Sequence, residues 1–110
     1  MFKQSSYVKL RVAAPRDSAK RIREVLGEAG AGVQGSYDFC SFTYPVSGHF
    51  RPLKGARPAL GRVGELETVA EEIIEVLCHK DKVKEAIKAL RLAHPYEEPA
   101  IDIIPRLELE

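Results

Sequence analysis

Residues 69–78 read Val-Ala-Glu-Glu-Ile-Ile-Glu-Val-Leu-Cys, and the fold depends on whether this segment is a helix or a strand. Its apolar residues recur at helical spacing, so periodicity on its own slightly favours one helix that continues through Leu92. Ile73, Ile74 and Val76 favour a strand instead, because branching at Cβ restricts χ1 in a helix. The residue pattern leaves both alternatives open.

The chain before this segment predicts a strand, a helix and a second strand. Polar and apolar residues alternate from Tyr7 to Ala13, which indicates a half-buried strand. Aromatic residues and Thr are frequent from Gly35 to Tyr44, and this composition favours another strand. A helix is predicted between these two strands, because four apolar residues fall on one helical face and a glycine follows the last of them. The four residues are Ile22, Val25, Leu26 and Ala29.

A long connection is predicted from Pro45 to Gly64. This stretch holds three prolines, four glycines and four basic residues, and it contains no acidic residue. Loops of this length without their own periodicity are uncommon in compact domains and are often functional. The chain after residue 78 predicts a helix with an apolar stripe over residues 83–93 and a last strand over residues 100–107.

If residues 69–78 form a strand, the element order becomes βαββαβ. That order is a ferredoxin-like α+β sandwich, in which two helices cover one face of an antiparallel sheet. The 110 residues then form a single domain, and another copy of the chain is the natural cover for the second sheet face.

The composition excludes several classes of protein. Hydrophobic residues make up 45% and charged residues 30%, which are ordinary globular values. A net charge of +1 argues against a nucleic-acid binder. The start of the chain lacks a signal-peptide core, and no apolar run is long enough to span a bilayer, so we expect a cytoplasmic, soluble protein without membrane contact. Cys40 and Cys78 have no Cys-x-x-Cys spacing and are expected to be reduced and buried.

The segment His-Pro-Tyr-Glu-Glu-Pro-Ala at residues 94–100 concentrates reactive side chains on a stiff backbone. Pro95 and Pro99 hold the residues before them in extended geometry. Two further motifs lie in the predicted loop, Gly-x-Phe-Arg-Pro at 48–52 and Pro-Ala-Leu-Gly-x-x-Gly at 58–64, and Gly-x-Tyr-x-x-Cys-Ser-Phe precedes them at 35–42.

These four ordered motifs resemble the YqfO-type PII-like domain, which occurs inside larger dimetal-binding proteins and as a small stand-alone protein. The end of the chain is also similar to that of CutA, a trimeric relative. The resemblance implies a ferredoxin-like fold, a homotrimer and a strand at about residues 69–78. It does not carry over the dimetal site of the larger proteins. The matching positions include the motif residues Tyr37, Cys40, Phe42 and Tyr96.

A divalent metal ion such as zinc is one hypothesis for the function of the 94–100 segment. His94, Glu97 and Glu98 offer nitrogen and oxygen ligands, and Cys40, His49 or a neighbouring subunit would have to complete the site. The alternative is architectural: His94 ends the helix, Tyr96 packs at an interface and the carboxylates form ion pairs there.

Two further hypotheses concern the loop and the cysteine. Arg51, Arg57 and Arg62 could bind an anion such as a nucleotide at a cleft between subunits, although no Walker-type motif is present. Cys40 and His94 could act as nucleophile and base if the fold brought them together. We expect a non-catalytic binding or regulatory module, because no third group that would orient Cys40 and His94 is evident. The adjacent Glu97 and Glu98 are also a poor acid–base pair, since an extended backbone points them apart.

Overall fold

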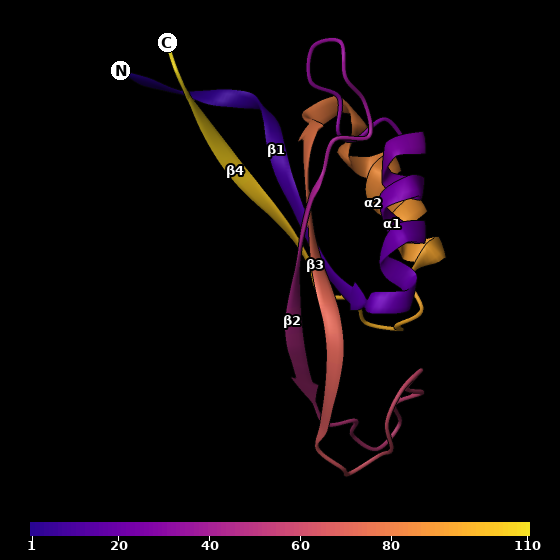
Figure 1. The fold of residues 1–110 in the computed structure, drawn as a ribbon. Helices are drawn as coiled ribbons and strands as arrows, with labels where there is room; N and C mark the ends of the chain where they lie inside the picture. Colours follow the sequence, from indigo (N-terminus) through magenta and orange to yellow (C-terminus); the bar gives the residue numbers. More distant parts are fainter.

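The computed structural model describes all 110 residues as one four-stranded sheet with two helices. The elements in chain order are β1 (Phe2–Pro15), α1 (Arg16–Glu28), β2 (Phe42–Phe50), β3 (Glu67–His79), a short 3-10 turn (Lys80–Lys82), α2 (Val83–Ala93) and β4 (Ile101–Leu109). Both helices lie on the same side of the sheet (Figure 1). This arrangement confirms the predicted ferredoxin-like α+β fold.

Strand β3 resolves the ambiguity of residues 69–78. It lies inside the sheet in the order β2-β3-β1-β4 and pairs antiparallel with both neighbours. Ile74 points to the helices and Ile73 to the opposite face, yet both are buried. Burial on both faces of a central strand produces a nearly continuous apolar run, which is why the segment lacks simple alternation.

The second strand and the loop begin later than the sequence predicts. Strand β2 covers residues 42–50, so the predicted strand at 35–44 is wrong for all but its last three residues. The predicted loop at 45–64 is wrong at its start, and the connection runs over residues 51–66. Pro45 is tolerated within β2 because this strand is at the sheet edge, where a missing N–H breaks no ladder bond.

The core lies between the sheet and the two helices. Even-numbered residues of β1 and β3 face it, and they meet the apolar stripes of α1 and α2 in one cluster. Its largest fully buried members are Leu10, Ile22, Leu26, Ile74 and Leu90. Neither helix has the length and apolar character that a bilayer crossing requires.

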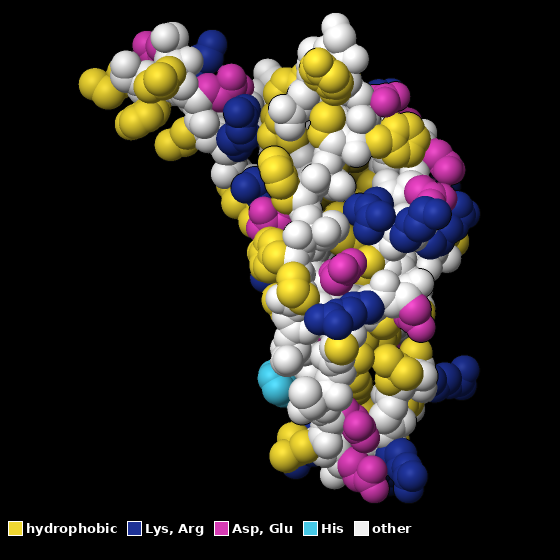
Figure 2. Space-filling model, viewed as in Figure 1, with side chains coloured by type: hydrophobic (Ala, Val, Ile, Leu, Met, Phe, Trp, Pro, Cys, Tyr) yellow, Lys and Arg dark blue, Asp and Glu magenta, His cyan; other side chains and the backbone are white.

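The molecule is elongated, with extents of 50 × 29 × 24 Å. Residues 2–4 of β1 pair only with residues 107–109 of β4, and these two short segments project as a ribbon, here called the terminal arm. The connection 51–66 lies at the opposite end of the molecule from both termini (Figure 1). Hydrophobic side chains are visible along the terminal arm (Figure 2), and the exposed ones are Met1, Phe2, Leu107 and Leu109.

Candidate functional site

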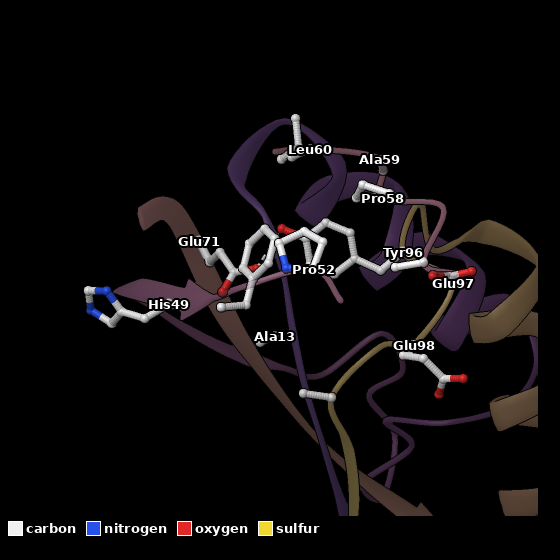
Figure 3. Close-up of a pocket in the computed structure, with 13 residues that line it drawn as sticks. Ala13, His49, Pro52, Pro58, Ala59, Leu60, Glu71, Tyr96, Glu97 and Glu98 are labelled. Carbon is white, nitrogen blue, oxygen red and sulfur yellow. Dashed lines mark hydrogen bonds between the residues drawn. The ribbon is translucent and has the colours of Figure 1, made fainter. Parts of the chain in front are cut away.

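A cavity of about 310 Å³ lies where the 51–66 connection meets the 94–100 segment. Ala13 and Glu71 border it from the sheet, Phe50 and Pro52 from the end of β2, and Tyr96 from the segment that follows α2 (Figure 3). We call this space the Tyr96 cavity. It joins three parts of the chain that are far apart in the sequence.

Tyr96 and Glu71 form the polar centre of the cavity. The Tyr96 hydroxyl donates a hydrogen bond of 2.7 Å to Oε2 of Glu71. Glu71 is only 7% exposed, although it is a carboxylate in a strand. Burial, followed by the hydrogen bond to Glu71, raises the pKa of Tyr96 above its ordinary value, so the phenol stays protonated and remains a donor.

The second carboxylate contact fastens the loop to the 94–100 segment. The backbone N–H of Arg57 donates to Oε1 of Glu97 at 2.9 Å. This bond closes one side of the Tyr96 cavity, because residues 56 and 58 on either side of Arg57 both line it. Within the protomer Glu97 thus accepts from a neutral backbone donor, and the ion pairs expected for the carboxylates at a subunit interface stay a prediction.

His94 lies at the end of α2 and is almost fully buried. Its Nε2 lies 2.8 Å from the carbonyl oxygen of Ala13, and its Nδ1 accepts from the Tyr96 backbone N–H at 3.1 Å. A carbonyl can only accept and a backbone N–H can only donate, so the two contacts place a proton on Nε2 and none on Nδ1. Both ring nitrogens are therefore occupied by backbone groups of the protomer, and His94 ends α2.

Carboxylates dominate the charge of the cavity. Of the thirteen residues that line it, Glu71, Glu97 and Glu98 are acidic, and none is Lys or Arg. None of the three takes part in an ion pair. His49 also borders the cavity, but its ring turns away from the other labelled side chains (Figure 3) and its Nδ1 lies 3.1 Å from Thr68 Oγ1.

The structure brings some of the predicted metal ligands near one another, but not as a ligand set. Within one protomer, no group of three or more His, Cys, Asp or Glu side chains is placed to hold a metal ion. Glu97, Glu98 and His49 share the cavity lining, whereas His94 and Cys40 are absent from it. The metal hypothesis for His94, Glu97 and Glu98 stays a prediction.

Cys40 and His94 lie at different levels of the sheet. The Cys40 backbone packs against Gly32, which lies beside Val76 of β3. Because Val76 pairs with Leu10, Cys40 lies near the level of Leu10 along β1. His94 instead contacts Ala13, three residues further along β1, or about 10 Å at the usual rise of a strand. The structure does not bring this nucleophile and base together. Cys78 is buried as expected, whereas Cys40 is only partly buried.

The aromatic motif residues and the arginines lie mainly on the surface. Tyr37 and Phe42 are each 74% exposed, so neither packs within the protomer. Arg62 pairs with Glu65 in the loop, with its Nε 4.0 Å from Oε2. Since Arg51, Arg57 and Arg62 are absent from the cavity lining, their anion hypothesis also stays a prediction.

Sequence reasoning missed Glu71 as a site residue. The signal was a carboxylate inside the apolar run of a central strand, where a buried acid needs a partner. It also missed the apolar walls supplied by Phe50 and by the loop residues Ala56 and Pro58. These residues meet only through long-range contacts, which no local pattern reveals.

Most of the chain is similar in sequence to one segment of longer proteins. No family model matches it. A Bacillus subtilis protein named GTP cyclohydrolase 1 type 2 homolog is 45% identical over 97 residues, which are 88% of this chain and 26% of that protein. A Mycobacterium tuberculosis protein of the same name is 44% identical over 92 residues, or 84% and 24%. The chain thus spans about a quarter of the length of these curated relatives.

Solved structures extend the comparison to the fold. A Bacillus cereus protein related to NIF3 superposes with a TM-score of 0.80 at 36% identity, covering 96% of this chain and 26% of that one. The periplasmic divalent cation tolerance protein CutA of Archaeoglobus fulgidus gives a TM-score of 0.67 at 22% identity, covering 91% and 83%. The chain therefore matches one segment of the larger relatives in sequence, and it has the fold of CutA.

Proposed function

We propose that this chain is a non-catalytic, homotrimeric binding or regulatory module whose ligand site is the Tyr96 cavity. The observation that carries the proposal is the cavity itself, with apolar walls around the half-buried Tyr96 and the buried Glu71. A concave, mostly apolar space with a few oriented polar groups is the usual form of a small-molecule site. Its volume of about 310 Å³ suits a small molecule rather than a peptide.

The trimer is supported by surfaces that one protomer leaves uncovered. The terminal arm is a two-stranded ribbon with exposed Phe2 and Leu109, and such ribbons are marginal in water by themselves. The sheet face away from the helices also exposes Phe42 and Tyr44. Other copies of the chain are the proposed cover for both, as the CutA-like fold suggests.

The absence of a catalytic role is supported by the separation of the two reactive side chains. Cys40 contacts the Gly32 turn, whereas His94 uses both ring nitrogens to hold Ala13 and Tyr96. The buried carboxylate Glu71 is engaged by a phenol whose raised pKa makes it a poor proton donor. Binding requires none of these groups to change its protonation state.

A cavity-filling variant tests the proposal. Ala59→Trp places an indole in the cavity from an exposed loop residue, and Leu53→Trp is the matched control, since Leu53 is exposed in the same loop outside the lining. Native mass spectrometry should find a small molecule or ion retained by the parent and by Leu53→Trp, and lost from Ala59→Trp. Equal retention by all three proteins would contradict the proposed site.

A divalent metal ion is the second candidate ligand. Three carboxylates border the cavity, and several proteins that share the fold are described as divalent cation tolerance proteins. Calorimetry with zinc on the parent, His94→Ala and Glu98→Gln tests it. Loss of binding in both variants supports the predicted ligand set, and equal binding by all three removes His94 and Glu98 from it.

A further inference from the structure

We propose that the Tyr96 cavity binds an organic cation, specifically a compact ammonium compound. This inference rests on the proposed function, because it names the class of ligand that the same cavity takes. It follows from three independent properties of the lining: its charge, its aromatic rings and its lack of a metal-binding geometry.

The charge of the cavity is negative and has no cationic counterpart in the protein. Glu71, Glu97 and Glu98 border the space, whereas no Lys or Arg side chain does. Glu97 and Glu98 are exposed and only Glu71 is buried. The donors to Glu71 and Glu97 are neutral groups, the Tyr96 hydroxyl and the Arg57 backbone N–H. Removing a carboxylate from water without an opposite charge is costly, and a bound cation would offset that cost.

Glu71 has acceptor capacity that the protein leaves unused. Only its Oε2 receives a hydrogen bond, whereas Oε1, which lies against Gly48 of β2, has no donor from the protein. Glu71 is only 7% exposed, and its carboxylate is directed toward the group of rings around the cavity (Figure 3). A ligand N–H or a methylated ammonium at this position would meet a charge that solvent screens poorly.

The aromatic rings supply the second property. The centroids of Phe50 and Tyr96 lie 6.4 Å apart, and the ring planes are inclined by 55°. Both rings border the cavity, and a cation within about 6 Å of the face of an aromatic ring is attracted by the ring quadrupole. An anion would be repelled by the faces and by the carboxylates alike.

The remaining walls favour an organic ion over a bare metal ion. Pro52, Ala56 and Pro58 contribute apolar surface that offers no ligand atom to a metal. No three metal-ligating side chains converge in the protomer. A cation that carries its own hydrocarbon surface satisfies both the carboxylates and the apolar walls, because it buries that surface on binding.

The test uses choline, its neutral isostere 3,3-dimethylbutan-1-ol and inorganic phosphate. The two organic probes have the same shape and differ in the charge of one central atom. Titrations followed by amide NMR should show choline shifting the signals of Phe50, Tyr96 and Ala100, which border the cavity. The neutral isostere should bind about tenfold or more weakly, as expected for loss of the cation.

Variants that remove one negative charge test which carboxylates contribute to choline binding. Glu71→Gln keeps the shape of the side chain and should weaken choline binding at least tenfold, and Glu98→Gln, at an exposed position, provides a variant that should fold normally. Glu85→Gln on α2 is the control and should bind choline like the parent. Unchanged choline affinity in both cavity variants would overturn the inference.

The outcomes separate this inference from the proposed function. If the isostere or phosphate shifts the cavity signals as strongly as choline does, the cavity is a ligand site but its preference for cations is refuted. If no probe shifts those signals at millimolar concentration, the cation inference fails, whereas the cavity as a ligand site is decided by the retention experiment on Ala59→Trp and Leu53→Trp.

Discussion

The Tyr96 hydroxyl donates a 2.7 Å hydrogen bond to Oε2 of Glu71, and this bond ties the segment after α2 to the central strand β3. His94 and Phe50 contact Tyr96 from two further directions, with ring centroids 5.0 and 6.4 Å away. The tyrosine is thus both the structural joint of the 94–100 segment and a wall of the cavity.

Removing only the Tyr96 hydroxyl should destabilise the protein. Tyr96→Phe leaves the buried Glu71 carboxylate without its donor, so we expect the free energy of unfolding to fall by about 1–3 kcal/mol. Tyr96→Ala also loses the ring, but Tyr96 is only half-buried, so the further loss should be below that of a core residue. Urea unfolding of the two variants measures both effects, and a parent-like Tyr96→Phe would show that the bond contributes nothing to stability.

The same residue should make stability depend on alkaline pH. The folded-state pKa of Tyr96 is raised, chiefly by burial, so the fold favours the protonated phenol. That contribution is fully present below the ordinary tyrosine pKa of about 10 and is lost as the pH rises above it. Melting temperatures between pH 8 and 11 should therefore fall less steeply for Tyr96→Phe than for the parent.

Tyr37→Phe is the control for this pH profile. Tyr37 is largely exposed, so removal of its hydroxyl should leave the fall of the melting temperature between pH 8 and 11 as it is in the parent. Burial also raises the pKa of the Cys78 thiol, which adds a loss of stability that begins near pH 9 in every variant. An identical slope in Tyr96→Phe and the parent would contradict the assignment to Tyr96.

Gly48 should tolerate no side chain. A Cβ built on Gly48 of β2 would collide with the carboxylate of Glu71 on the neighbouring strand. Gly48→Ala is therefore expected to displace Glu71 from Tyr96 and to cost about 1–3 kcal/mol, as overpacking usually does. Ser47→Ala is the control, because Ser47 points to the opposite face of the sheet. Thermal melts compare the two, and equal melting temperatures would show that Glu71 moves aside freely.

The contact between Glu97 and Arg57 should order the loop without adding much stability. The bond is exposed, so Glu97→Ala is expected to lower the free energy of unfolding by under about 1 kcal/mol. Hydrogen exchange of the Arg57 amide should nevertheless become faster, because it loses its acceptor. Glu98→Ala should leave that exchange rate unchanged, and the reverse result would place the loop contact on Glu98 instead.

The terminal arm should be needed for association. Leu107→Ser and Leu109→Ser together remove exposed apolar surface from the arm, and we expect light scattering to show that the proposed trimer dissociates at micromolar concentration. Leu92→Ser is the matched control, since Leu92 is 82% exposed but lies on α2, away from the arm. A monomeric parent protein would refute the proposed trimer, and a trimeric arm variant would exclude the arm from its interface.

Elements that bury only one face can be predicted from the residue pattern alone, because their apolar residues recur with a single period. The alternation in Tyr7–Ala13 and the apolar stripes of α1 and α2 each identify one buried face, and the observed core contains those residues. The element order, combined with the motif resemblance, then led to the ferredoxin-like arrangement. The two prolines around residues 95–99 likewise indicated a rigid segment after α2.

The strand β3, the start of β2 and the lining of the cavity depend on long-range contacts and could not be predicted from local pattern. Residues 69–78 form a strand because β1 and β2 supply hydrogen-bond partners on both sides. Ile73 and Ile74 are buried on opposite faces, so the alternation of polar and apolar residues that would identify a strand is missing. Pro45 is accepted because its strand is at the edge of the sheet. Glu71 and Tyr96 meet across 25 residues of chain, and a contact of that range depends on strand pairing rather than on local propensity.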